Sequence, residues 1–424
     1  MKKYKNLILF LTVVTLITAS IFIPIKSNQK TIKKPVPDNT KQKLIAQVDV
    51  IQAETLDVNY LDERSRPTCN PLPYGTVDYC QETSQFYKLN SQQRLYKGSV
   101  KTYYGVLPEH NKVQFVDGYI DNGKLVLEFS QSFKAPFKTD FGIADYKNPY
   151  PENSERPDYS INNFLCDEFK IEFSYCDKII GDLALPDNSV FVDIKSDKNT
   201  LSLTLKNNNI FCGYTAEYNQ KGNLCFVFTS AQKTNKADNK YGTLLTGKTI
   251  MIDAGHGGED CGAKGKSEYY TEAALNLILS KLIKTELESI GANVIMTRTQ
   301  DKQLLLKQRT QLIYEHKPDV FISIHRNAAE NKDATGYENY YYYPFSKNLA
   351  DYVFDFASKS FDRDLAVKYY PFYVTRATTC PSILTENGFV SNRQELDEIK
   401  LYENNLILAQ NTVKGIAEYF LSLN

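Results

Sequence analysis

Two of the four histidines in this 424-residue chain stand at the ends of apolar segments, where a side chain can reach a bound ligand. His256 follows the apolar run 250–252 and lies among glycines, a combination typical of a buried strand that ends in a tight turn. His325 ends a second such strand, 319–325. In an open α/β sheet, ligands bind at the carboxyl ends of the strands. The two imidazoles therefore indicate a metal site.

A catalytic zinc usually takes three protein ligands and leaves one position to water, so a third side chain is needed. Residues 271–287 have the apolar spacing of a helix with Thr271 as its N-cap, which places Glu272 in the first turn. Glu268 could also reach the metal, but we favour Glu272 because the apolar helix starts right after it. The apolar strand 381–386 ends in Glu386, a further candidate for the same site.

These landmarks resemble one known family, the zinc-dependent N-acetylmuramoyl-L-alanine amidases of bacterial cell-wall hydrolysis. The similarity runs from about residue 247 to 423, roughly two fifths of the chain. Its segments, in chain order, are Asp253-Ala-Gly-His-Gly-Gly258, Glu272, Thr297-Arg298, Ser323-Ile-His-Arg-Asn327, Gly336-Tyr-Glu338 and Glu386-Asn-Gly-Phe-Val-Ser-Asn392. Two positions depart from the family's pattern: Ala273 stands where lysine usually follows the ligand glutamate, and Cys261 stands where proline is common.

The resemblance implies zinc (Zn²⁺) as cofactor, with His256, Glu272 and His325 as its ligands and Glu386 as the catalytic carboxylate. Such a carboxylate can take a proton from a zinc-activated water and pass it to the departing amine. The implied substrate is peptidoglycan, and the implied bond is the amide between N-acetylmuramic acid and L-alanine. The implied enzyme is an N-acetylmuramoyl-L-alanine amidase.

Several other polar residues are expected to stabilise the structure and not to bind the metal. Arg298 and Arg309 are predicted to pair with carboxylates and to tie the second strand to the next helix. Asn327 lies two residues after His325 on the same face of an extended segment, where it could face a ligand or cap a turn. His110 and His316 are not expected to bind metal, and His316 should lie near a helix end, where the helix dipole favours a cation.

Residues 247–424 alternate strand and helix, which predicts an α/β catalytic domain: a mixed, mostly parallel sheet with helices on both faces. The predicted strands lie near 248–253, 292–298, 319–325, 337–343 and 381–386. The predicted helices lie near 272–290, 304–316, 346–360 and 403–421.

Residues 60–235 are predicted to form a β-rich domain, an antiparallel sandwich, because strand-length apolar or alternating segments are separated by turn clusters. The sequence leaves three roles open for this domain: wall targeting, regulation, or service as a structural spacer. Residues 27–59 and 236–246 have the polar composition of linkers. Residues 1–26 are predicted to be a signal peptide or a membrane anchor, because basic residues precede an uncharged, largely apolar run from 6 to 25.

We therefore expect an extracytoplasmic protein, either secreted or held at the membrane through residues 6–25. Eight cysteines agree with an oxidising compartment. Their spacing favours the pairs Cys69–Cys80, Cys166–Cys176, Cys212–Cys225 and Cys261–Cys380, although sequence alone cannot fix connectivity. Fifty basic and fifty acidic residues leave no positive surplus that would indicate nucleic acid as a partner.

Three alternatives stay open. The pair in His256-Gly-Gly-Glu259 also fits a zinc carboxypeptidase, but that interpretation leaves Glu272 and Glu386 unexplained. A wall-binding module could keep the fold and the metal without catalysis, although all four chemical residues are present. An inserted helix that occludes the zinc is not expected, because the connection 331–335 is short. Activation by an unidentified protein partner through the β-rich domain is a further possibility.

Overall fold

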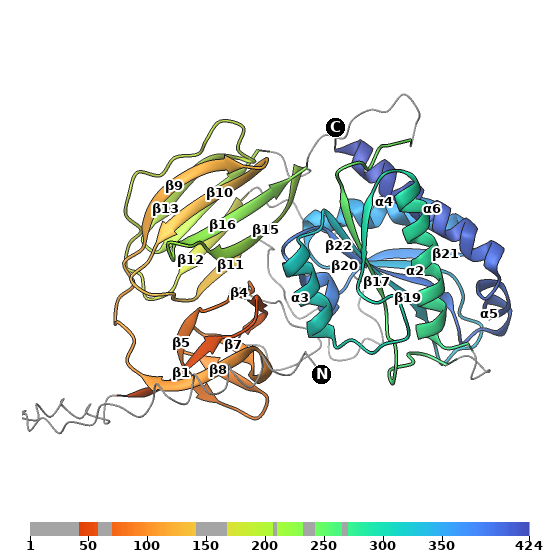
Figure 1. Ribbon diagram of the computed structural model, residues 1–424, viewed down its shortest axis with the longest axis horizontal. Helices are drawn as coiled ribbons and strands as arrows, with labels where there is room; N and C mark the ends of the chain where they lie inside the picture. Colours follow the sequence, from red (N-terminus) through yellow and green to blue (C-terminus); the bar gives the residue numbers. More distant parts are fainter. Residues whose placement is uncertain are drawn as a thin grey trace, which may run out of the picture. The chain divides into compact units, whose positions relative to one another are not determined.

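The computed structural model describes residues 42–57, 70–140, 168–206, 210–231, 242–264 and 270–423 (Figure 1). The predicted signal peptide or anchor, 1–26, and most of the predicted linker 236–246 lie outside these ranges. No described helix combines the length and the apolar character that crossing a membrane requires. The described chain is β-rich up to residue 230 and alternates strands and helices from residue 249, which confirms the expected β-rich N-terminal part and mixed α/β C-terminal part.

The first sheet has six antiparallel strands in the order β3-β7-β6-β5-β1-β8. Their bounds are β1 (Lys43–Val48), β3 (Thr55–Asp57), β5 (Val77–Glu82), β6 (Phe86–Leu89), β7 (Gln93–Tyr96) and β8 (Val100–Gly105). A short pair, β2 (Gln52–Ala53) and β4 (Leu72–Pro73), and the 3-10 turn η2 (Lys97–Ser99) complete this part. The predicted linker 27–59 is therefore wrong for residues 43–57. β1 pairs with a strand on each side and buries Ile45, Ala46 and Val48, a pattern masked by the polar residues around it.

Two four-stranded sheets follow, in the orders β15-β16-β10-β9 and β11-β12-β14-β13. Their bounds are β9 (Gln114–Asp121), β10 (Lys124–Ser130), β11 (Phe137–Asp140), β12 (Glu168–Phe173), β13 (Phe191–Asp197), β14 (Thr200–Leu205), β15 (Phe211–Tyr218) and β16 (Leu224–Ser230). Phenylalanine rings join the two sheets: the centroids of Phe129 and Phe173 lie 5.2 Å apart, and those of Phe169 and Phe228 lie 5.3 Å apart. The aromatic core between them makes this part a sandwich.

The C-terminal sheet has six strands in the order β18-β17-β19-β22-β20-β21. Their bounds are β17 (Thr249–Ala254), β18 (Asn293–Met296), β19 (Val320–Asn327), β20 (Tyr337–Tyr341), β21 (Asp364–Tyr369) and β22 (Ser382–Phe389). The first four strands in this order are parallel, β20 runs antiparallel to β22, and β21 runs parallel to β20. The helices are α2 (Glu272–Ser289), α3 (Leu306–His316), α4 (Lys347–Ala357), α5 (Arg393–Ile399) and α6 (Tyr402–Ser422), with short 3-10 turns that include η6 (Tyr373–Arg376).

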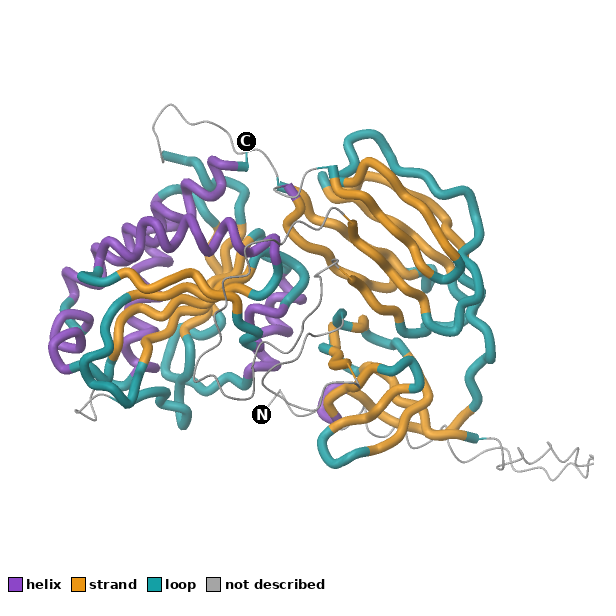
Figure 2. Tube along the Cα trace, turned by 180° about the vertical axis from the view of Figure 1, so that it is seen from behind, coloured by secondary structure: helices purple, strands orange, loops and turns teal. Residues whose placement is uncertain are grey.

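Alternate residues of β17 pack into different apolar clusters. Ile250 and Ile252 share a cluster with Leu279 and Ile283 of α2. Met251, which points the other way, packs with Ile313 of α3. Strand residues that face away from each other thus meet different helices, and Figure 2 shows the helices arranged around the strands of this sheet.

The bridges Cys212–Cys225 and Cys261–Cys380 are absent, since all four residues are free thiols. Cys225 pairs with Glu217 in the β15–β16 register, and Cys212 lies five residues back along β15. That separation is about 17 Å along an extended strand, against at most about 7 Å between the Cα atoms of a disulfide. Cys380 precedes the amino end of β22, whereas Cys261 follows the carboxyl end of β17. Cys80 and Cys176 are free thiols, and their expected partners lie outside the described residues.

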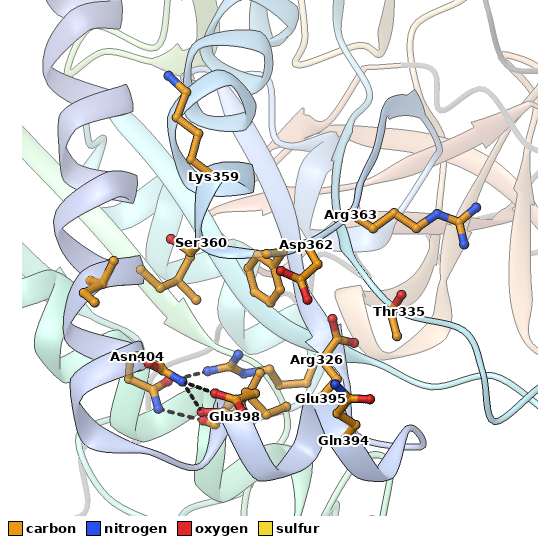
Figure 3. A pocket seen from close by; sticks show the side chains of 15 residues that line it. Arg326, Thr335, Lys359, Ser360, Asp362, Arg363, Gln394, Glu395, Glu398 and Asn404 are labelled. Atoms are coloured by element: carbon orange, nitrogen blue, oxygen red, sulfur yellow. Dashed lines mark hydrogen bonds between the residues drawn. The ribbon is translucent and has the colours of Figure 1, made fainter.

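A hollow of about 590 Å³ lies beside Arg326 of β19 (Figure 3). Arg326 is buried, with 2% of its surface exposed, and its guanidinium donates to Asn405 Oδ1 at 2.6 Å and to the carbonyl of Asn387. Lys359, Arg363, Glu395 and other charged or polar side chains complete the lining. Because cationic and anionic side chains are mixed in this lining, the hollow has no preference for anionic or for cationic ligands. Arg326 anchors the carboxyl end of β19 to α6.

Candidate metal centre

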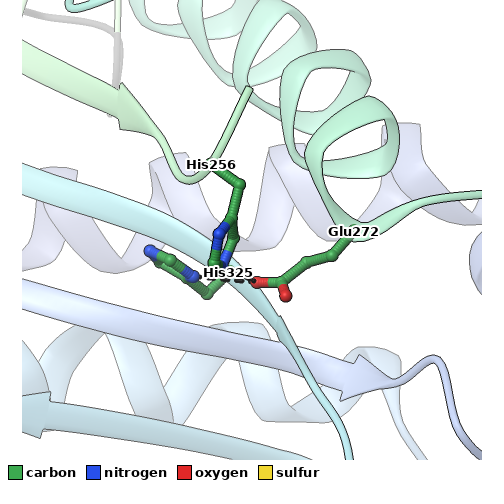
Figure 4. Close-up of side chains that lie close together, drawn as sticks. All are labelled: His256, Glu272 and His325. Carbon is green, nitrogen blue, oxygen red and sulfur yellow. Dashed lines mark hydrogen bonds and ion pairs between the residues drawn. The ribbon is translucent and has the colours of Figure 1, made fainter. Parts of the chain in front are cut away.

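His256, Glu272 and His325 come together at the carboxyl edge of the mixed sheet (Figure 4). His256 follows β17, His325 lies near the end of β19, and Glu272 begins α2. One ligand atom from each residue lies within 4.8 Å of the others. Glu272 Oε1 is 2.8 Å from His325 Nδ1 and 3.2 Å from His256 Nε2. Within the described ranges, this is the group of side chains with the geometry to hold a metal ion.

Glu272 is held from several sides. Thr271 caps α2 by accepting a hydrogen bond from the peptide N–H of Ala274, which fixes the first helical turn. The carboxylate, on a residue only 4% exposed, accepts hydrogen bonds from the peptide N–H groups of Ala263 (2.9 Å) and Arg326 (3.2 Å). Burial acts to raise the pKa of Glu272, but the hydrogen bonds with the two histidines hold it well below its ordinary value. The group is therefore an anion.

His256 has a left-handed backbone, with φ of +59°, which is unusual for a residue with a side chain. Arg309 stabilises this conformation by donating from Nη2 to the His256 carbonyl at 2.9 Å. Asp260 lies 2.9 Å from His256 Nδ1, so the other ring nitrogen is turned toward Glu272. Burial lowers the pKa of His256, but Glu272 and Asp260 outweigh it and the net shift is upward. Strain of this kind collects at functional sites.

Two glycines leave the room that the group needs. A Cβ atom at Gly255 would lie 2.3 Å from His325 Nε2, and one at Gly262 would lie 2.5 Å from Glu272 Oε2. Gly262 also has φ of +63°. Two imidazole nitrogens and one ionised carboxylate are the donor set of many catalytic zinc sites, so the residues present fit this metal.

Arg309 and Arg298 support the loop that carries His256. Arg309 forms a buried ion pair with Asp253, as expected for a structural arginine. Arg298 has a different role from the predicted carboxylate pairing, because it donates to backbone carbonyls of the loop and of α2. Its carbonyl acceptors are Ala254 at 2.8 Å, Gly255 at 2.9 Å, Ala273 at 2.8 Å and Gln300 at 3.3 Å.

Glu386 lies opposite His325 in the register of β19 and β22 and lines the same cleft, which has a volume of about 470 Å³. Its Oε2 atom is buried and has no hydrogen-bond partner within the described residues. Burial, and then the negative charges of Glu272 and Glu338, raise its pKa well above the ordinary value. A carboxyl group with a free oxygen and a raised pKa is suited to accept a proton and to give it back.

Sequence reasoning assigned no role to Asp260, Glu338 or Lys368. Asp260 stands four residues after His256, a spacing that could have drawn attention to it. Glu338 accepts hydrogen bonds from the Tyr340 hydroxyl and from Lys368 Nζ, the latter at 2.8 Å. Lys368 lies on β21, a strand that was not predicted, so nothing in the sequence pointed to this pair.

The remaining sequence candidates lie as follows. The Asn327 side chain accepts a hydrogen bond from the peptide N–H of Ala328 at 2.8 Å, which is the turn-capping alternative, and Asn327 also lines the cleft. His110 pairs with Asp177 on the exposed surface, and His316 is the last residue of α3. Glu268 lies outside the described residues.

The cleft has an apolar lip. Leu305 and Leu306, at the start of α3, are 63% and 54% exposed. They line the cleft together with Phe372, Tyr373 and Val374. Large apolar side chains beside a charged group are positions where a ligand with both apolar and polar parts can bind.

Comparison with known proteins places these features in context. A family model described as N-acetylmuramoyl-L-alanine amidase matches residues 250–418. YqiI of Bacillus subtilis (strain 168), described as an uncharacterized protein, is 35% identical over 181 residues, which are 42% of this chain and 86% of YqiI.

Two further relatives have descriptive names. LytC of Bacillus subtilis (strain 168), named an N-acetylmuramoyl-L-alanine amidase, is 30% identical over 203 residues, which are 47% of this chain and 40% of LytC. LytH of Staphylococcus aureus, named a probable cell wall amidase, is 35% identical over 187 residues, which are 43% of this chain and 62% of LytH. The chain therefore spans less than two thirds of the length of LytC and of LytH.

Proposed function

Since this chain belongs to the N-acetylmuramoyl-L-alanine amidase family of enzymes, we propose that residues 247–424 hydrolyse the amide bond between N-acetylmuramic acid and L-alanine in peptidoglycan. The observation that carries the proposal is the convergence of His256, Glu272 and His325 within 4.8 Å, in a cleft that also contains Glu386. A chain that served only as a wall-binding module would have no need for a buried carboxylate with an unpaired oxygen in that cleft.

We assign zinc to His256, Glu272 and His325. A zinc ion held there would supply a water of lowered pKa and would polarise the carbonyl of the amide. Asp260 orients the His256 ring through Nδ1, and the peptide N–H groups of Ala263 and Arg326 orient the Glu272 carboxylate. The loop and the helix thus set the donor atoms in place before any ligand arrives.

Glu386 is proposed as the general base and acid. It takes a proton from the attacking water as the new carbon–oxygen bond forms. The same proton then passes to the alanine nitrogen as the carbon–nitrogen bond breaks, so that a free amine leaves and Glu386 is ionised again. The unpartnered Oε2 atom is available for this proton. Burial, which raises the pKa of Glu386, favours a form of this carboxyl that carries a proton between the two steps.

The apolar lip fits the groups that flank the scissile amide. The lactyl group of N-acetylmuramic acid and the side chain of L-alanine each present a methyl group. Leu305 and Leu306 offer exposed apolar surface beside the proposed metal ligands. The polar tips of Asn327 and Tyr373 at the same cleft can meet the sugar and peptide polar groups.

We further propose an extracytoplasmic location. The similarity to a protein named a probable cell wall amidase supports this location. The basic start followed by the apolar run 6–25 is consistent with export, either as a signal peptide or as an anchor. A protein activator remains a proposal without an identified partner.

The carboxypeptidase alternative is disfavoured by the position of its second ligand. Glu259 is exposed and is not part of the described group that could hold a metal. Glu272, by contrast, belongs to that group.

The deciding experiment is mass spectrometry of purified peptidoglycan after incubation with the full chain, with and without a chelator. Stem peptides that begin at L-alanine, released only when zinc is available, would establish the amidase. Peptides shortened at their C-terminal end would support the carboxypeptidase. Absence of any release from a zinc-loaded protein would overturn hydrolysis by the chain alone, and would favour a binding module or an enzyme that depends on an activator.

A further inference from the structure

One wall of the cleft is attached to the N-terminal β-rich region, residues 43–230. This wall consists of the segment 303–306, which leads into α3, and of residues 372–374, at the start of η6. Neither segment supplies a candidate metal ligand. Residues that follow each segment make polar contacts with the β-rich region: Lys307 and Gln311 after the first, and Arg376 after the second.

The first attachment is through α3. Gln311 Nε2 donates to the carbonyl of Gln52 at 2.7 Å, and Lys307 Nζ donates to the carbonyl of Gly98. Residues four apart share a helix face, so Lys307 and Gln311 form one contact surface. Arg309 lies two residues from each, on roughly the opposite face, where it binds Asp253 and the His256 carbonyl. α3 therefore joins the β-rich region directly to the loop of His256.

The second attachment is through η6. Arg376 Nε lies 2.9 Å from Glu54 Oε1, and the two side chains are only 8% and 10% exposed. A second contact joins Arg376 Nη2 to Glu54 Oε2 at 3.4 Å. The Arg376 guanidinium lies over the Tyr373 ring, 4.8 Å from its centroid. Glu54 thus holds a cation that packs on a tyrosine ring, and that tyrosine lines the cleft.

A buried ion pair adds little net stability, because desolvation of both charges offsets their attraction. Its effect is to fix one geometry, since any displacement leaves a buried charge unpaired. Arg376 and Glu54 come from segments 322 residues apart in sequence. The pair therefore sets the position of η6, and with it the position of Tyr373, relative to the β-rich region.

We propose that Glu54 is a positioning residue for the substrate cleft, which fixes Tyr373 through Arg376, so that the β-rich region forms part of the apparatus that binds the glycan–peptide polymer. This inference rests on the proposed amidase function. It replaces the spacer and targeting alternatives with a defined structural role: the region shapes the wall against which the substrate binds. Glu54 touches neither substrate nor metal and acts through Tyr373.

The test compares Glu54→Gln with Glu128→Gln in the full chain. Glu128 is likewise a buried carboxylate, and it accepts hydrogen bonds from Asn219 (2.9 Å) and Asn223 within the sandwich, away from the cleft lining. Glu54→Gln should raise KM for peptidoglycan about tenfold with kcat within about twofold, because misplacement of a binding wall weakens substrate positioning. Zinc content should stay unchanged. Glu128→Gln should keep the wild-type KM.

Tyr373→Leu provides a second variant that keeps the Glu54–Arg376 pair and removes the ring on which the Arg376 guanidinium packs. It should raise KM in the same direction. The double variant should be no worse than the more affected single variant, because both changes interrupt the same series of contacts from Glu54 through Arg376 to Tyr373. Wild-type KM in both single variants, or a fall in kcat and zinc content at unchanged KM, would overturn the inference.

A binding assay separates this inference from the proposed activity. In a Glu386→Gln background, co-sedimentation with insoluble peptidoglycan measures binding without turnover. Glu54→Gln should weaken that binding about tenfold, matching the rise in KM. If the wild-type chain releases no stem peptides but this weakening is seen, the positioning role holds and the proposed reaction fails. If the chain is an active amidase and Glu54→Gln binds and turns over normally, the positioning role fails and the reaction stands.

Discussion

Glu338 and Glu386 lie directly opposite each other on the antiparallel strands β20 and β22, yet their carboxylates have different partners. Glu338 is neutralised by Lys368 Nζ at 2.8 Å and bound by the Tyr340 hydroxyl. Glu386 Oε2 is buried with no hydrogen-bond partner within the described residues. Two carboxyl groups in such different environments are suited to different roles, which supports the proposal that Glu386 transfers the proton.

Glu386→Gln should therefore lower kcat by about 10²–10⁴-fold, because the amide cannot accept the proton, and it should leave zinc content unchanged. His325→Ala should lose both zinc and activity. Release of stem peptides and metal analysis of the purified variants measure the two effects. Turnover close to the wild-type value in Glu386→Gln would show that another group carries the proton.

Removal of zinc should lower thermal stability as well as activity. The metal binds only the folded arrangement of the three ligands, so at 100 times its Kd it adds about 2.7 kcal/mol to the free energy of unfolding. The unfolding midpoint measured with and without chelator should shift, and added zinc should restore it. His325→Ala is the control and should show no response to either treatment. An equal response in that variant would place the metal elsewhere.

Gly262→Ala should weaken zinc binding by about 10–100-fold, the usual effect of disturbing the groups that orient a ligand. A Cβ atom there would overlap the Glu272 carboxylate. Gly222→Ala is a matched control, because Gly222 also has a positive φ, of +82°, but no atom lies within 4 Å of the added Cβ. Both variants should lose about 1 kcal/mol of stability from backbone strain. Calorimetric titration with zinc should separate them, and equal affinities would contradict the steric account.

Acid should destabilise the metal-free protein through Asp253. Burial acts to raise the pKa of this carboxyl, but Arg309 and hydrogen bonds from Thr297 and Ser323 hold it below its ordinary value. A carboxyl whose pKa is lower in the folded than in the unfolded state stabilises the fold above about pH 4. That contribution is lost as the pH falls through the folded pKa.

Asp253→Asn should accordingly lower the free energy of unfolding near pH 7 by about 3–5 kcal/mol, since Arg309 stays buried without its partner. The variant should also lose less stability than the wild type between about pH 4 and pH 2. Urea unfolding at several pH values in chelator measures both. Asp355→Asn, at an exposed position on α4, is the control. If Asp253→Asn lost as much stability in acid as the wild type, the loss would come mainly from other carboxyl groups.

The sequence was informative where chemistry lay at the ends of apolar strands. His256, His325 and Glu386 were expected at one edge because parallel strands bring their carboxyl ends together, and the structure has them at that edge. Glu272 was chosen over Glu268 from the helix start, and the structure has Glu272 in the first turn of α2. Their roles as ligands and as proton acceptor stay predictions.

The features that were missed depend on contacts between distant segments. β1 is a strand because β5 and β8 pair with it, not because of its own composition. β21 pairs only at the edge of the sheet, with β20, and its residues are mostly half-buried, so its apolar pattern is weak. The expected cysteine pairs failed for a related reason, since closeness in sequence along β15 and β16 does not bring Cys212 and Cys225 into register.

The strand order of the mixed sheet also determines when the cleft is complete. β22 follows all other strands of that sheet in sequence but lies between β19 and β20. Until residues 382–389 are inserted, the sheet consists of two separate pieces, and His325 has no Glu386 beside it. Pairings that span so much of the chain form slowly. A chain in which β22 is displaced would keep all three candidate metal ligands and lack the proposed proton acceptor, so insertion of this one strand is a condition for the proposed reaction.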